Sequence, residues 1–251
     1  MPTPPDLRVV SDPLALFQAA ANEFASRAVA SVKTAGRFTV ALSGGSTPKS
    51  FFSLLAKNDR DRLPWDKMFF FWGDERHVPP DSPESNYCMA LEALLSKVPV
   101  PPGNVFRVPA EDPDAGRAAQ KYEQSLREFF QVPAGAYPRF DLILLGMGPD
   151  GHTASLFPGT AALHEKSRLV VANWVEKFKT DRITLTLPVI DEAKVVMFLV
   201  SGADKADTLK EVLEGTQPAE LFPSKLIDPR DGKLIWLVDR AAAGALSKLR
   251  A

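Results

Sequence analysis

The chain has 251 residues, with 30 Lys and Arg against 31 Asp and Glu, so its formal net charge is −1 at pH 7. This balance argues against nucleic-acid binding by broad phosphate neutralisation, which needs a basic face. With 45% hydrophobic and 24% charged residues, the composition is that of a globular protein and not of a disordered one. No apolar run approaches the roughly 18–20 residues that span a bilayer, so we also expect no membrane partner.

The N-terminus and the cysteine content both bear on the cellular compartment. Residues 1–10 contain Pro2, Pro4 and Pro5 and no apolar core behind a basic start, so they do not have the pattern of a signal peptide. A single cysteine, Cys88, rules out an internal disulfide and a cysteine-based zinc cluster. We therefore expect a cytoplasmic protein, and we expect it to be a monomer.

Helix patterns alternate along the chain with short apolar runs. Apolar residues recur at spacings of three and four in Asp12–Lys33, which is typical of one helix face. The other predicted helices are Pro48–Lys57, Glu84–Lys97, Asp114–Phe130, Lys205–Leu213 and Arg240–Leu249. The predicted strands are Phe38–Leu42, Met68–Trp72, Phe140–Leu145, Leu169–Trp174, Ile183–Leu187, Val195–Val200 and Leu234–Val238.

The predicted strands are almost continuously apolar, as strands covered on both faces must be. Their alternation with helices predicts an α/β fold with an open, mostly parallel sheet flanked by helices, Rossmann-like and doubly wound. No Ser/Gly linker, charge block or repeat divides the sequence, so we expect one domain over residues 1–251.

Open α/β sheets bind ligands beyond the carboxyl ends of their strands, which directs attention to the segments that follow them. Four such segments contain glycine together with charged or hydroxyl side chains. They are Ser43–Pro48, Gly73–His77, Gly146–Thr153 and Ser201–Lys205. We expect all four to open on one edge of the sheet.

The first of these loops is a candidate phosphate cradle. Its glycines allow close approach of backbone N–H groups to an anion, and we expect Thr47 as N-cap and Pro48 as first helical residue. The structural alternative is a capped turn. The absence of a Walker lysine argues against a nucleoside triphosphate site. Ser43 lies one residue off a nucleophile elbow, but Asp150 and His152 are too close together to complete a serine esterase triad.

The loop after Phe140–Leu145 presents Asp150 and His152. Residues 146–151 fit the dinucleotide pattern G-x-G-x-x-G, but Pro158 and Gly159 interrupt the helix that this pattern must open. A carboxylate beside an imidazole fixes its tautomer and raises its basicity, as a general base near neutral pH requires. The structural alternative is a capping Asp beside a structural His.

Several charged residues are candidate partners for an anion. Arg76, next to Asp74 at the end of a very apolar strand, suits a phosphate or a carboxylate, and a salt-bridged turn is the alternative. Lys205 begins a predicted helix, where a cation is unfavourable unless an anion lies nearby. Arg182 is a weaker candidate. The histidines lack the spacing of metal ligands, so we expect no metal.

These segments resemble the 6-phosphogluconolactonase family. The resemblance is carried by Ser43–Pro48, Gly73–Arg76 with Ser85–Tyr87, Gly146–Pro158 and Arg182–Thr186. It implies an α/β enzyme without metal or cofactor that hydrolyses 6-phosphogluconolactone in the pentose phosphate pathway. It further implies His152 as general base, Asp150 as its orienting group and Asp74 as a third catalytic-site residue. The implied substrate-binding residues are Ser43, Gly44, Gly45, Ser46, Thr47, Arg76, Arg182 and Lys205, with the phosphate on the N–H groups of Gly44 to Thr47 and with Arg76 and Lys205 as its counter-charges.

Two other functions stay open at this point. Glucosamine-6-phosphate deaminase shares the glycine loop and the Asp-Gly-His motif, but it has Tyr where this chain has Arg76 and Glu where this chain has Phe157. The other is a non-catalytic sugar-phosphate sensor, which usually carries a DNA-binding segment. Only one clear helix precedes Phe38.

Overall fold

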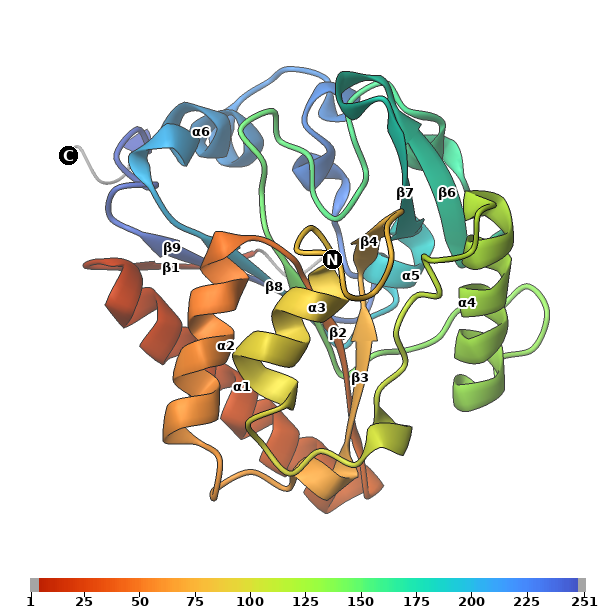
Figure 1. The fold of residues 1–251 in the computed structure, drawn as a ribbon. Coiled ribbons are helices and arrows are strands. Elements are labelled where there is room, and N and C mark those ends of the chain that lie inside the picture. The colour runs from red at the N-terminus through yellow and green to blue at the C-terminus, as the bar shows by residue number, and fades with distance from the viewer. Residues whose placement is uncertain (1–4, 248–251) are drawn as a thin grey trace.

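A computed structural model describes residues 5–247 (Figure 1). Its main sheet has six strands in the order β1-β9-β8-β5-β2-β3, and every neighbouring pair is parallel. The strands are β1 (Asp6–Val10), β2 (Phe38–Leu42), β3 (Met68–Trp72), β5 (Leu142–Leu145), β8 (Val195–Val200) and β9 (Lys233–Asp239). The predicted open parallel sheet is therefore confirmed.

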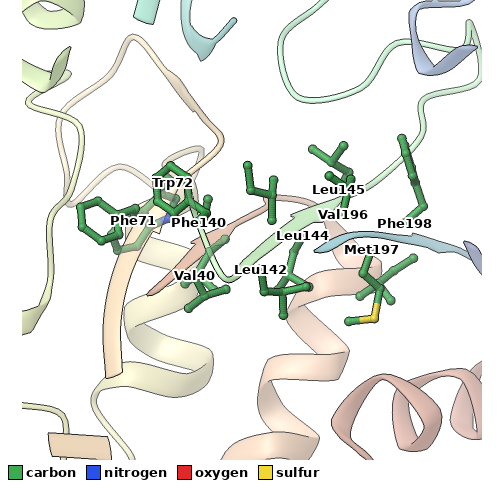
Figure 2. Close-up of a cluster of buried hydrophobic side chains, with 14 of the residues drawn as sticks. Val40, Phe71, Trp72, Phe140, Leu142, Leu144, Leu145, Val196, Met197 and Phe198 are labelled. Carbon is green, nitrogen blue, oxygen red and sulfur yellow. The ribbon is translucent and has the colours of Figure 1, made fainter. Parts of the chain in front are cut away.

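The central strands form the middle of the hydrophobic core. Every residue of β2, β5 and β8 is buried, because helices and loops cover the sheet on both faces. Figure 2 shows side chains of β2, β3, β5 and β8 gathered there, with Val40, Leu142 and Met197 among them.

The helices flank the sheet (Figure 1). They are α1 (Pro13–Ala35), α2 (Ser46–Asn58), α3 (Asn86–Ala90), α4 (Ala115–Phe130), α5 (Leu187–Asp191) and α6 (Ala206–Glu214). The longest, α1, is capped at its start by the Asp12 carboxylate, which accepts from the N–H of Ala15, and ends at Gly36 with a φ of 73°. It packs against α2, β2 and β9. None of the helices in residues 5–247 has the length and hydrophobicity required to cross a membrane.

A second sheet corrects part of the sequence prediction. It is antiparallel, in the order β4-β7-β6, and consists of β4 (Asp74–Arg76), β7 (Thr180–Leu185) and β6 (Val170–Val175). Two strands predicted for the parallel sheet, 169–174 and 183–187, lie here instead. Their apolar runs predicted strands correctly, but they carry no information about direction or partner. The helix α4 packs against β6 and β7.

Three further predictions differ from the structure. Strand β1 was missed because its residues are exposed or half-buried at the sheet edge. The predicted helix 84–97 is divided into α3 and a π-helical turn, Leu91–Leu95. The predicted helix 240–249 is wrong over residues 240–247, which form turns and no α-helix, while 248–249 lie outside the described residues. Gly244 lies in the middle of this Ala-rich stretch and weakens it as a helix.

Candidate active site

The four predicted loops meet at one edge of the main sheet. Strands β2, β3, β5 and β8 are parallel neighbours, so their carboxyl ends lie together. A cavity of about 320 Å³ opens there. Its lining includes ten of the predicted site residues, namely Ser43, Gly44, Gly45, Ser46, Thr47, Asp74, Arg76, His152, Arg182 and Lys205. The eleventh, Asp150, contacts His152.

The start of α2 forms one wall of the cavity. The helix begins at Ser46, and its N-cap is Gly45 with a φ of 103°, so the prediction of Thr47 as N-cap is wrong. Only glycine adopts this backbone readily, and it lets the helix start two residues earlier than predicted. The N–H groups of Ser46 and Thr47 have no intrahelical acceptor, and both residues line the cavity at the positive end of the helix dipole. This geometry suits an anion.

A buried asparagine fits the glycine loop closely. A Cβ on Gly44 would lie only 1.8 Å from Asn86 Oδ1, so this position accepts no side chain. The Asn86 side chain is held in place because its Nδ2 donates to the carbonyl oxygen of Asp74. Its Oδ1 has no hydrogen-bond partner among the described residues. The contact explains why the loop requires glycine at position 44.

Two arginines that repel each other also line the cavity. Arg76 on β4 and Arg182 on β7 are directly paired in the antiparallel register. Like charges at such positions repel. Burial, and then the charge of Arg76, lower the pKa of the Arg182 guanidinium. An anion between the two arginines would relieve this repulsion, so the pair indicates an anion site.

Lys205 adds a third cation at the end of β8. It lies immediately before α6, and its ammonium pairs with the exposed carboxylate of Asp204 at 2.8 Å. The unfavourable position of this cation at a helix start is thus partly offset within the chain. Only 20% of the Lys205 side chain is exposed, and it still lines the cavity.

The buried Glu75 fixes β4 against α3. Its carboxylate accepts from the N–H groups of Arg76, Asn86 and Tyr87 and from the Ser85 hydroxyl. Burial raises the pKa of Glu75, and the N–H donors oppose that shift. Because this network ties Arg76 to the start of α3, it positions the arginine at the cavity.

Asp150 and His152 form a hydrogen-bonded pair. Nδ1 of the imidazole contacts Oδ1 of Asp150, and Lys177 Nζ lies 3.2 Å from the other carboxylate oxygen. Burial of Asp150 opposes ionisation, but the hydrogen bond and charge of His152, together with Lys177, outweigh it and hold the pKa of Asp150 well below its usual range. An ionised carboxylate only accepts, so Nδ1 carries the proton and Nε2 is left as the basic nitrogen of the neutral ring.

Aromatic and glycine residues set the orientation of the imidazole. Phe157 stacks on the His152 ring with centroids 4.1 Å apart and an interplanar angle of 23°. On another side, a Cβ at Gly148 would lie 2.0 Å from His152 Cε1, so the ring requires glycine there. The imidazole is therefore confined before any ligand binds.

Asp74 and two backbone N–H groups of the 148–151 loop have hydrogen-bond partners within the protein. The buried Asp74 carboxylate accepts from the Ser155 hydroxyl at 2.7 Å. Two backbone donors of the 148–151 loop are occupied, because Gly148 N–H donates to the carbonyl of His152 and Gly151 N–H donates to the carbonyl of Gly148. These two N–H groups are therefore not free to donate to a bound substrate.

Sequence reasoning missed four residues of the site. Phe178 and Lys177 carried no motif that distinguished them from structural or surface residues. Ser155 lies in the Gly146–Pro158 segment that contributed to the family resemblance, but its position gave no sign of contact with Asp74. Asn86 lies in the Ser-Asn-Tyr segment that contributed to the family resemblance, but its position gave no sign of contact with Gly44. Within residues 5–247, no cluster of three or more His, Cys, Asp or Glu side chains is able to hold a metal ion.

The parallel α/β sheet carries a helix start, three cations and a carboxylate–imidazole pair at its carboxyl edge, an arrangement that suits an enzyme for a small phosphorylated molecule. The model of the family "Glucosamine-6-phosphate isomerases/6-phosphogluconolactonase" matches residues 11–236. The chain belongs to this family, as the sequence motifs predicted.

Similar proteins with names in this family match over nearly the full chain. The 6-phosphogluconolactonase of Nostoc sp. is 43% identical over 96% of this chain and 98% of its own length. That of Synechocystis sp. is also 43% identical, over 95% of this chain and 97% of its own. The structure of 6-phosphogluconolactonase from Trypanosoma cruzi superposes with a TM-score of 0.88 at 33% identity, covering 98% of both chains. A monomeric glucosamine-6-phosphate deaminase shares the fold, with a TM-score of 0.80 at 22% identity.

Proposed function

We propose that the protein hydrolyses 6-phospho-D-glucono-1,5-lactone to 6-phosphogluconate in the cytoplasm, as a step of the oxidative pentose phosphate pathway. One observation carries this proposal: His152, with Asp150 hydrogen-bonded to it, lines the same cavity as the start of α2, Arg76, Arg182 and Lys205. Such a cavity accommodates a substrate with a reactive ester at one end and a phosphate at the other. The relatives named 6-phosphogluconolactonase support the choice of lactone.

The phosphate is assigned to the cationic wall. The N–H groups at the start of α2 donate to its oxygens, and the opposed pair Arg76 and Arg182 neutralises its charge together with Lys205. Binding of a dianion removes the repulsion between the arginines, so part of the electrostatic energy of the free site favours the complex. The phosphate thereby orients the lactone ring toward His152.

Hydrolysis then needs one proton acceptor and one proton donor. Nε2 of His152 takes a proton from water as its oxygen attacks the C1 carbonyl, and Asp150 stabilises the resulting imidazolium. The tetrahedral intermediate collapses with cleavage of the bond between C1 and the ring oxygen, which receives the proton from Nε2. General-base catalysis of this kind typically contributes about 10²–10⁴-fold. Positioning and oxyanion stabilisation supply the rest, and no covalent intermediate is required.

The residue beside the imidazole discriminates between the two activities in the family name. Phe157 offers no carboxylate and packs its ring flat on His152. The deaminase was distinguished in the sequence analysis by a Glu at this position, which serves in ring opening. An apolar neighbour removes that proton relay but leaves the base available for water, so the site favours lactone hydrolysis over deamination.

The direct test is an assay with freshly generated lactone, following 6-phosphogluconate through a coupled dehydrogenase and subtracting the spontaneous rate. We expect catalysed turnover by the wild type and a loss of about 10²-fold or more in His152→Ala, with binding of 6-phosphogluconate retained. Glucosamine-6-phosphate serves as the comparison substrate and should release no ammonia. Turnover of His152→Ala near the wild-type rate would remove His152 as the base, and ammonia release would favour the deaminase.

A further inference from the structure

The turn that connects β6 to β7 reaches back to the Asp150–His152 pair. It contains the short 3₁₀ segment Glu176–Phe178, 27 residues along the chain from Asp150. Nζ of Lys177 lies 3.2 Å from Asp150 Oδ2, on the carboxylate oxygen that His152 does not use. The carboxylate is thus shared between an imidazole and an ammonium.

The same turn also bears on the other side of the imidazole. Phe178 packs edge-on against Phe157 with centroids 5.8 Å apart, and Phe157 stacks on the His152 ring. The guanidinium of Arg182 lies over the Phe178 ring at 5.3 Å. One turn therefore contacts three residues of the site: Asp150, Phe157 and Arg182.

We propose that Lys177 is a positioning residue that holds Asp150 in place beside His152 and weakens the attraction of that carboxylate for an imidazolium. The effect on turnover rests on the proposed function, whereas the effect on the imidazole does not.

The Lys177 ammonium disfavours a charged imidazolium at position 152 because both groups share the Asp150 carboxylate. A cation on the second carboxylate oxygen weakens the attraction of that carboxylate for an imidazolium and repels the imidazolium directly. The other charged side chains that line the cavity with His152 are Asp74, Arg76, Arg182 and Lys205. A substitution at position 177 leaves all of them in place, so a change in the titration of His152 reports the removed ammonium.

Solvent limits the electrostatic effect of the Lys177 charge on His152. The Lys177 side chain is 57% exposed, so its field at His152 is screened by water and by salt. Because the ammonium lies on the Asp150 oxygen that His152 does not use, Coulomb's law in a largely aqueous dielectric limits its effect to about half a pH unit.

The experiment compares Lys177→Met with Lys177→Arg, which keeps the charge, and with Lys179→Met as the matched control. Lys179 is exposed on the same turn and has no ion-pair partner within residues 5–247. In Lys177→Met, we expect the acid limb of the curve of kcat/KM against pH to shift to higher pH by about half a unit. We also expect kcat to fall a few-fold. The other two variants should keep the wild-type limb, and higher ionic strength should shrink the difference.

Nuclear magnetic resonance of the imidazole nitrogens tests the same claim without substrate. The chain has three histidines, and the resonance that disappears in His152→Gln assigns the relevant ring. We expect its titration midpoint to rise by about half a unit in Lys177→Met. An unchanged midpoint there, or an equal rise in Lys179→Met, overturns the inference. If wild-type lactonase activity is absent but the midpoint still moves, the proposed function fails and the role of Lys177 toward His152 stands.

Discussion

Gly148→Ala places a methyl group in the space that the imidazole of His152, the proposed general base, occupies. A Cβ at this position would lie 2.0 Å from His152 Cε1 and 2.1 Å from Nδ1, where ordinary contact begins at 3.4 Å. The φ of Gly148 lies outside the left-handed region, so alanine is compatible with the backbone. The ring therefore has to move, by about 1.4 Å for ordinary contact with Cε1.

A displacement of this size is large for catalysis and small for the fold. A misplacement of about 1 Å of a catalytic group can cost about 10²-fold in rate, which corresponds to about 2.7 kcal/mol of transition-state stabilisation. The new methyl group would also lie 2.9 Å from Asp150 Oδ1, so the hydrogen bond that fixes the tautomer of His152 is disturbed as well. We expect kcat to fall by at least about 10²-fold, with little change in the affinity for 6-phosphogluconate.

The coupled lactone assay measures kcat and KM, and calorimetric titration with 6-phosphogluconate measures binding. Gly73→Ala is the matched control, since it follows β3 at the same edge of the sheet and its nearest contact would be the carbonyl of Leu42 at 3.6 Å. That variant should retain wild-type kcat. Turnover of Gly148→Ala within a few-fold of wild type would show that the imidazole is not confined as described, and the argument for His152 would lose its geometric basis.

Two further predictions concern affinity and stability. Arg182→Met removes one of the two paired cations, so we expect a KM about tenfold higher with kcat changed much less. Because the substitution also relieves the repulsion with Arg76, the free energy of unfolding of the ligand-free protein should rise by about 0.2–1 kcal/mol. An unchanged KM in the lactone assay would remove Arg182 from the anion site. Burial raises the pKa of Asp191 to about 7, above its unfolded value, so its contribution to stability is complete in acid and is lost as the pH rises through about 7. In urea unfolding, the free energy of unfolding of Asp191→Asn relative to wild type should increase by about 1–2 kcal/mol from pH 4 to pH 8, after allowance for the partial exposure of the side chain. Parallel curves of unfolding free energy against pH for the two proteins would contradict this.

The parallel sheet was predictable because its strands are buried on both faces. The bounds predicted for β2, β3 and β8 match the structure at both ends. Such strands must be apolar throughout, and the helices between them force the parallel direction. The position of the cavity followed from the same topology, since strands in parallel order carry their following loops to one edge.

The second sheet was not predictable in the same way. Strand β4 consists of three charged residues, Asp74–Arg76, which in sequence resemble a loop. They form a strand because β7 pairs with them and because backbone N–H groups around α3 satisfy the buried Glu75. These interactions connect residues far apart in the chain, and no local pattern records them. The same holds for the contact between Lys177 and Asp150.

The antiparallel sheet contributes Arg76 and Arg182 to the site, and the loops after the parallel strands form the other parts of the cavity wall. Loops at the carboxyl edge of the parallel strands supply the helix start and the His152 loop. The antiparallel register is what places Arg76 opposite Arg182, at a cost of a few tenths of a kcal/mol to about 1 kcal/mol in the free protein. A surface that served only to fold would lose nothing by separating these charges. An anion between them would make their direct opposition favourable, so the register supports the proposed phosphate site.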